Sequence, residues 1–187
     1  MKQVLIALLM AATLPVAHAV DLAGVNVVEQ SEVAGKSLQL NGAGIRKKLM
    51  FEVYVAALYT AGKSSDAAAV IKSQQPRRMQ LTMLRNVEAQ TLVDALVDGL
   101  KDNLSAAEFT AQTARIAEMQ KILLEAKVAN KGDVVTLDCL PGQGTRLILR
   151  SKVLGQIAGD DFSSALLSIW LGQKPVQEHL KLKLLGM

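Results

Sequence analysis

The sequence has few of the residues that form disulfides, metal sites or catalytic triads. Its one cysteine, Cys139, excludes an intramolecular disulfide, and of its two histidines only His179 lies beyond residue 19. A triad needs a base beside a nucleophile, and a metal site needs clustered Cys, His, Asp or Glu. The sequence shows neither arrangement, since the pair Asp160-Asp161 stands alone and is typical of a helix cap. We therefore predict no metal, no cofactor and a fold held together by packing.

Aromatic residues and net charge are also low. Only six residues are aromatic, and Lys and Arg exceed Asp and Glu by 21 to 17, for a net charge of +4. Proteins that bind nucleic acid use a concentrated basic stripe or aromatic side chains on which bases stack. Residues 141–145, PGQGT, lack the strand-GxGxxG-helix context of a phosphate-binding loop and are typical of a hairpin turn. We predict no nucleic-acid partner.

The first nineteen residues have the pattern of a secretory signal peptide. Lys2 precedes a short apolar run, VLIALLMAATLPVA, and Ala17-His18-Ala19 provides a small-residue cleavage signature. The run is shorter than the roughly 20 residues that a membrane span needs, and no second run of this kind follows. We therefore predict that residues 1–19 are removed after Ala19, and that residues 20–187 form one periplasmic domain without a transmembrane segment. The alternative is that residues 1–19 stay attached as an uncleaved anchor.

Two hydrophobic periods divide the chain between strands and helices. Apolar and polar residues alternate, as in half-buried strands, over 37–45, 50–60, 77–85, 133–140, 145–150 and 153–157. Spacing by three and four residues indicates helices over 87–127 and 160–171, and Ser105 with Glu108 forms a capping box that starts a second helix within the first range. Cys139 falls on the apolar face of its strand, so we expect a buried thiol. This order favours an α+β fold with helices over one face of a mainly antiparallel sheet.

Arg46 and Tyr54 are polar residues within an otherwise apolar stretch, NGAGIRKKLMFEVYVAALY (residues 41–59). In one straight strand, the eight steps between them would span about 26 Å, beyond the joint reach of their side chains. A turn at Lys47-Lys48 would fold the stretch into a hairpin with Arg46 near its end and Tyr54 near Asn41, so that both side chains could reach one small anion. The alternative is that Arg46 and the two lysines are solvated residues of an exposed turn.

The motifs NGAGIR (41–46), VYVAALY (53–59) and GDDFSSALLSIWLGQKPV (159–176) occur in this order along the chain. Together they make about residues 37–186 resemble the bacterial exported branch of the chalcone isomerase-like proteins. The resemblance implies an open-faced β-sandwich, in which a large antiparallel sheet packs against a helical layer with an apolar cleft between them.

Two kinds of member in this family imply different functions. Plant enzymes close a chalcone into a flavanone by intramolecular attack of a phenolate on an enone, whereas their relatives bind fatty acids. The resemblance implies that Arg46 holds the oxyanion or the carboxylate, and that Tyr54 shares the carboxylate as in the fatty-acid binders; the enzymes carry threonine there. The enzymes also have a tyrosine and an asparagine where this sequence has Thr91 and Asp98. This departure counts against an isomerase, because one well-placed donor contributes about 2.7–4 kcal/mol to oxyanion stabilisation.

We therefore expect a periplasmic protein that binds a fatty acid or a related amphiphilic carboxylate, with Arg46 and Tyr54 as ligand-binding residues. One alternative is an isomerase of the intramolecular-lyase type that acts on a conjugated ketone, with Arg46 as a catalytic residue. Another is a non-catalytic module that is structural or binds a protein partner. The expected partner is a small amphiphilic ligand, and the sequence does not decide the oligomeric state.

Overall fold

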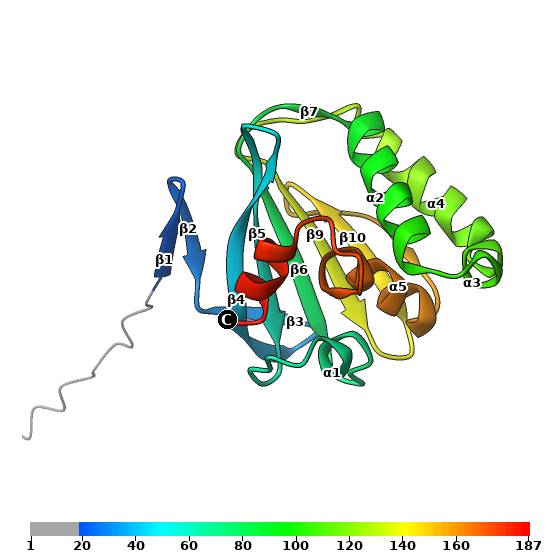
Figure 1. Ribbon diagram of the computed structural model, residues 1–187, viewed down its shortest axis with the longest axis horizontal. Coiled ribbons are helices and arrows are strands. Elements are labelled where there is room, and N and C mark those ends of the chain that lie inside the picture. The colour runs from blue at the N-terminus through cyan, green and yellow to red at the C-terminus, as the bar shows by residue number, and fades with distance from the viewer. Residues whose placement is uncertain (1–18) are drawn as a thin grey trace, which may run out of the picture.

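A computed structural model describes residues 19–187 (Figure 1). The strands are β1 (Ala19–Leu22), β2 (Val25–Val28), β3 (Gln30–Val33), β4 (Lys36–Lys48), β5 (Phe51–Thr60), β6 (Arg77–Met83), β7 (Val87–Glu88), β8 (Val128–Ala129), β9 (Val134–Leu140), β10 (Gly144–Leu149) and β11 (Lys152–Ile157). The helices are α1 (Ala67–Ile71), α2 (Ala89–Asn103), α3 (Ala106–Ala111), α4 (Thr113–Leu124), α5 (Asp160–Leu171) and α6 (Glu178–Leu184).

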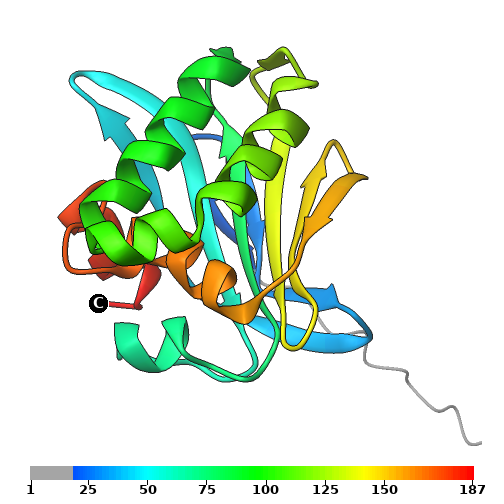
Figure 2. The same ribbon diagram turned by 90° about the vertical axis from the view of Figure 1, so that its right-hand side faces the viewer.

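The main element is a seven-stranded sheet in the order β11-β10-β9-β6-β5-β4-β3, in which all neighbouring strands are antiparallel. Helices α2, α4 and α5 cover one face of this sheet, as the two ribbon views show (Figures 1 and 2). This architecture confirms the predicted α+β fold of the open-faced sandwich type. The predicted signal peptide, apart from Ala19, lies outside the described residues and stays a prediction.

Strand β5 is buried on both of its faces. Because side chains alternate along a strand, Tyr54 and Leu58 point toward the helices, whereas Val55 and Tyr59 point to the opposite face. There they pack with Val27 of β2 in a second, smaller apolar cluster. The β1-β2 hairpin therefore covers part of the sheet face that the helices leave open. All members of both clusters lie within residues 20–187, the range predicted to form the domain.

The close contact between helices α2 and α5 depends on a small residue. A Cβ atom at Gly99 of α2 would lie 2.7 Å from Cγ2 of Ile169 in α5, so glycine permits this close approach. The capping box of Ser105 and Glu108 is confirmed and starts α3, while the predicted helix beyond it divides at Gln112 into α3 and α4. Within the described part of the chain, none of the helices has the length and apolar character needed to span a bilayer.

Cys139 lies in the main apolar cluster with no exposed surface, which confirms the expected buried thiol. Burial raises the pKa of this thiol to about 11, because the thiolate would lose its hydration. The side chain therefore acts as a small apolar group.

Candidate functional site

The β4-β5 hairpin brings Arg46 and Tyr54 directly opposite each other. The two residues are Cα partners in the ladder, and the turn lies at residues 49–50, beyond the end of β4 at Lys48. The expected turn at Lys47-Lys48 and the expected pairing of Tyr54 with Asn41 are therefore wrong. The register of this pairing shifts at two irregularities, between Leu40 and Gly42 and between Arg46 and Lys47.

Tyr54 is anchored deep in the site by the indole of Trp170. The Trp170 Nε1–H donates to the Tyr54 hydroxyl at 3.0 Å, and only 7% of Tyr54 is exposed. Burial raises the pKa of the phenol, while this hydrogen bond and the charge of Arg46 oppose the shift. The phenol is thus protonated at neutral pH. Because the Trp170 indole and the Arg46 guanidinium can only donate hydrogen bonds, the Tyr54 hydroxyl proton is available to an acceptor in the site.

Arg46 is half-buried and lies between the hairpin and the start of α6. Its Nη1 donates to the backbone carbonyl of Lys47 and, at 3.3 Å, to Oε1 of Gln177, which also accepts from the Lys47 amide at 2.8 Å. No carboxylate among residues 19–187 forms a salt bridge with it. A guanidinium has five N–H donors, so Arg46 retains donors for an anionic group.

Both side chains line a cavity of about 100 Å³ between the sheet and helices α2 and α5, which we call the inner cavity. Most of its wall is formed by the apolar side chains of Val53, Leu81, Leu92, Leu96, Ile169 and Trp170. The polar groups come from Arg46, Lys48, Tyr54 and Thr91. A mainly apolar wall with a few polar groups is the usual composition of a small-molecule site, although this space is smaller than the usual range of about 300–1,000 Å³.

A more open hollow of about 350 Å³ adjoins the inner cavity, and we call it the mouth. Lys48, Val53, Val87 and Thr91 line both spaces. These shared walls make the mouth the outer end of the inner cavity. It lies at the end of the sheet where the β4-β5 turn and the β6-β7 loop meet.

Two further positions marked in the sequence differ in where they lie. Thr91 lines both spaces, whereas Asp98 belongs to neither; its side chain is 73% exposed and pairs with Lys101 at 3.6 Å. Trp170 belongs to the helix expected over 160–171, but sequence reasoning missed its part in the site. A signal was present, because a buried indole N–H needs an acceptor.

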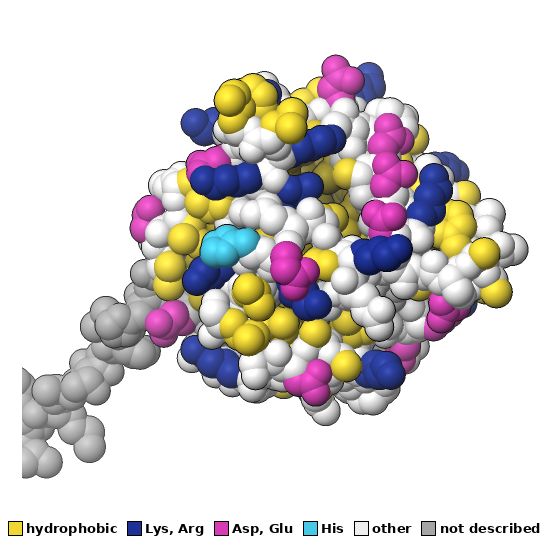
Figure 3. Space-filling model, in the orientation of Figure 1, with side chains coloured by type: hydrophobic (Ala, Val, Ile, Leu, Met, Phe, Trp, Pro, Cys, Tyr) yellow, Lys and Arg dark blue, Asp and Glu magenta, His cyan; other side chains and the backbone are white. Residues whose placement is uncertain are grey.

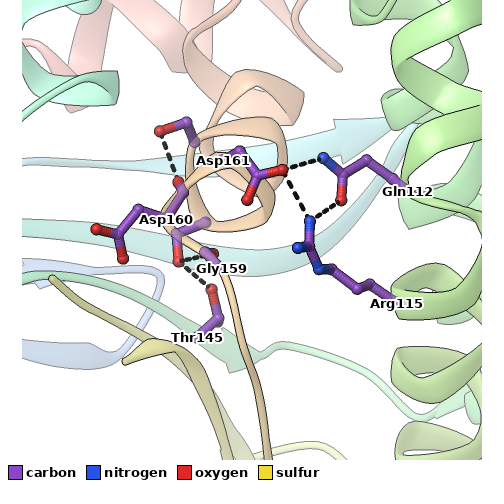
Figure 4. Close-up of polar contacts among 8 residues, drawn as sticks. Gln112, Arg115, Thr145, Gly159, Asp160 and Asp161 are labelled. Atoms are coloured by element: carbon purple, nitrogen blue, oxygen red, sulfur yellow. Dashed lines mark hydrogen bonds and ion pairs between the residues drawn. The ribbon is translucent and has the colours of Figure 1, made fainter. Parts of the chain in front are cut away.

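A second polar cluster surrounds the start of α5 (Figure 4). The Asp161 carboxylate accepts from Gln112 at 2.8 Å and from Arg115 at 2.7 Å. Both hydrogen bonds lower its pKa, and the bond from Gln112 has the larger effect. Asp160 accepts from the Gly142 amide at 3.0 Å. The expected cap is thus only partly right. Asp160 and Asp161 lie in the first turn of α5, but the N-cap residue is Gly159, which has no side chain to cap the helix. The two carboxylates instead join α5 to neighbouring segments. Within residues 19–187, no group of three or more His, Cys, Asp or Glu side chains could hold a metal ion.

The chain was compared with known proteins. Curated protein sequences give no match. Among solved structures, a fatty-acid binding protein of Arabidopsis thaliana matches with a TM-score of 0.73 and 11% identity, over 90% of this chain and 95% of the plant chain. At this identity, the likeness shows a shared fold. The family model described as chalcone isomerase-like matches residues 19–186, and the chain therefore belongs to the chalcone isomerase-like family.

Proposed function

We propose that the protein binds a fatty acid or a related amphiphilic carboxylate, with the carboxylate at Arg46 and Tyr54. The observation that carries the proposal is the pairing of these two donors on the wall of one apolar cavity. Arg46 has no carboxylate partner among residues 19–187, and the Tyr54 proton is available for an acceptor. The fatty-acid binding named for the structurally similar plant protein supports the same class of ligand.

The size of the inner cavity decides how such a ligand lies. A cavity of about 150 Å³ holds a benzene molecule, and the inner cavity, at about 100 Å³, is smaller. It therefore takes the carboxylate and the first carbons, while the remaining chain lies in the mouth. This arrangement uses the shared wall of Lys48, Val53, Val87 and Thr91 as the passage between the two spaces.

Hydrocarbon burial and the polar contacts have different roles. Sixteen methylene groups at about 0.8 kcal/mol each give an upper limit near 13 kcal/mol, whereas one charge-assisted hydrogen bond contributes about 1.5–3 kcal/mol. Association costs several kcal/mol, so we expect a dissociation constant in the micromolar range. The hydrocarbon chain of the ligand supplies most of the affinity, and Arg46 selects and orients the carboxylate.

Native mass spectrometry of gently purified protein tests the proposal. Wild-type protein should carry a fatty acid, and Arg46→Ala should weaken its binding about ten- to hundred-fold, because one charge-assisted hydrogen bond is lost. Lys47→Ala is the matched control, since Lys47 is the next cation on the same strand and lines neither space. Equal fatty-acid occupancy in wild type and Arg46→Ala would remove Arg46 from the site. Chalcone cyclisation above the spontaneous rate, lost in the same variant, would assign the site to an isomerase instead.

We also propose that the protein acts in the periplasm after removal of residues 1–19. The apolar run and the Ala17-His18-Ala19 signature support this location. Protein isolated from the periplasmic fraction of a bacterial host should begin at Val20 by N-terminal sequencing. Intact protein confined to the cytoplasm would contradict the proposal.

A further inference from the structure

The turn between β4 and β5 exposes three consecutive large apolar side chains. Leu49 is 90% exposed, Met50 86% and Phe51 52%. Single apolar residues are common on protein surfaces, but a consecutive exposed run is unusual unless it has a function. Leu49 also adopts a φ of +56°, a conformation for which tight hairpin turns normally use Asn, Asp or Gly. Turn geometry therefore does not explain why this residue is apolar.

Basic side chains flank the exposed run, and residues 47–51 with Arg85 are called the hairpin tip below. Lys47 and Lys48 precede the run, and the Arg85 guanidinium lies 4.5 Å from the centre of the Phe51 ring. Glu52 pairs with Lys47 at 3.1 Å, whereas Lys48 and Arg85 form no salt bridge within residues 19–187. Figure 3 shows hydrophobic side chains at this end of the hairpin with Lys and Arg side chains beside them.

We propose that the hairpin tip docks on the surface of an anionic phospholipid bilayer. Apolar side chains inserted at the headgroup boundary and cations next to lipid phosphates strengthen such binding together. The apolar run lies at a protruding turn, which suits insertion between headgroups better than contact with a flat protein surface. Lys48 and Arg85, which form no salt bridge among residues 19–187, contact the phosphates, while Leu49, Met50 and Phe51 enter the interface.

Docking in this way brings the mouth to the bilayer. Lys48, Leu49, Phe51 and Arg85 belong to the hairpin tip and also line the mouth. An amphiphile can then pass between the membrane and the inner cavity without crossing water with its hydrocarbon chain exposed. This transfer step rests on the proposed fatty-acid binding, whereas the docking itself does not.

Vesicle flotation of the chain starting at Val20 tests the docking. This chain keeps both apolar clusters and omits the apolar run of residues 1–19, which would itself enter vesicles. Binding is expected to vesicles of phosphatidylcholine mixed with an equal part of phosphatidylglycerol, and to decrease in high salt or with phosphatidylcholine alone. Lys48→Gln and Arg85→Gln should each weaken it about five-fold, the contribution of one cation near an anionic surface.

Met50→Asp is the most informative variant, with Met187→Asp as its matched control. Both methionines are highly exposed, at 86% and 61%, and Met50 lines neither the inner cavity nor the mouth. Met50→Asp should weaken vesicle binding at least ten-fold, because it removes an inserted side chain and adds repulsion by anionic lipid. Met187→Asp should bind like wild type.

The same variants separate the two proposals. If both proposals are right, Arg46→Ala binds fatty acid more weakly but binds vesicles like wild type. Met50→Asp then binds fatty acid in solution like wild type but binds vesicles more weakly. Equal vesicle binding by wild type and Met50→Asp overturns the docking. Wild-type binding that is equally strong with and without phosphatidylglycerol overturns it as well. Absence of wild-type vesicle binding also overturns it and leaves a protein partner as the occupant of the tip. Normal fatty-acid binding by Arg46→Ala overturns the ligand site alone.

Discussion

Replacing Tyr54 by phenylalanine tests the hydrogen bond at the centre of the site. The change removes one hydroxyl and leaves the Trp170 Nε1–H without the acceptor that it has at 3.0 Å. Trp170 is 1% exposed, so only a water molecule inside the inner cavity could replace that acceptor. An unsatisfied buried donor costs about 1–3 kcal/mol. We therefore expect the free energy of unfolding to fall by this amount, with a decrease in Tm of roughly 2–4 °C for each kcal/mol in a domain of this size.

Tyr59→Phe is the matched control, because Tyr59 is the only other tyrosine and lies on the same strand. Its hydroxyl donates to the Val28 carbonyl at 3.1 Å, and Val28 is 45% exposed. Water can reach the carbonyl after the change, so the expected cost is about 0.5–1.5 kcal/mol. Urea unfolding of the three proteins measures the difference. A loss in Tyr54→Phe no larger than in Tyr59→Phe would refute the argument that the indole N–H is left unpaired.

The same variant changes how stability depends on pH. Burial raises the pKa of Tyr54 above its ordinary value of 10.0, so the folded state holds this proton more tightly than the unfolded state. The stabilisation is complete below about pH 10 and is lost as the pH rises toward the folded pKa, by at most about 1.4 kcal/mol per pH unit. Tyr59 and Cys139 are shifted in the same direction and remain in the variant. Tyr54→Phe should therefore lose stability less steeply above pH 10, and an unchanged slope would contradict the assignment.

Three further predictions concern the scaffold. Asp138 is fully buried and accepts from Arg78 at 2.6 and 2.9 Å and from Arg146 at 2.8 Å, so Asp138→Asn should lower the free energy of unfolding by about 3 kcal/mol in urea titrations; a loss below about 1 kcal/mol would contradict the pairing. The Cys139 thiol, with a pKa of about 11, should react with a disulfide reagent only after unfolding, and rapid native labelling would show an accessible thiol. Leu49 has a φ of +56°, a left-handed conformation that glycine adopts without strain. Leu49→Gly should therefore raise the free energy of unfolding by up to about 1 kcal/mol, and Tm with it. A lower Tm would show that this conformation is not strained.

The alternation in β5 and the helical spacing in α2 and α5 were sufficient to predict the α+β fold. Each of these segments is long and has one strongly apolar face, so its period identifies it without knowledge of its neighbours. The two polar site residues, Arg46 and Tyr54, were also recognisable because they interrupt an apolar stretch. The turn was misplaced, because Lys47-Lys48 has the polarity of a turn whereas the actual turn contains Leu49 and Met50.

The sequence alone therefore determined the fold class, the buried thiol and the two residues of the candidate site. Only the tertiary structure decided that Arg46 and Tyr54 face each other, that Trp170 binds the phenol and that the inner cavity opens beside an exposed apolar tip. Those features depend on the strand register and on a contact between residues 116 positions apart in the chain. The physical reason is that local periodicity reports which face of an element is buried, whereas the packing of the whole chain determines what that face contacts.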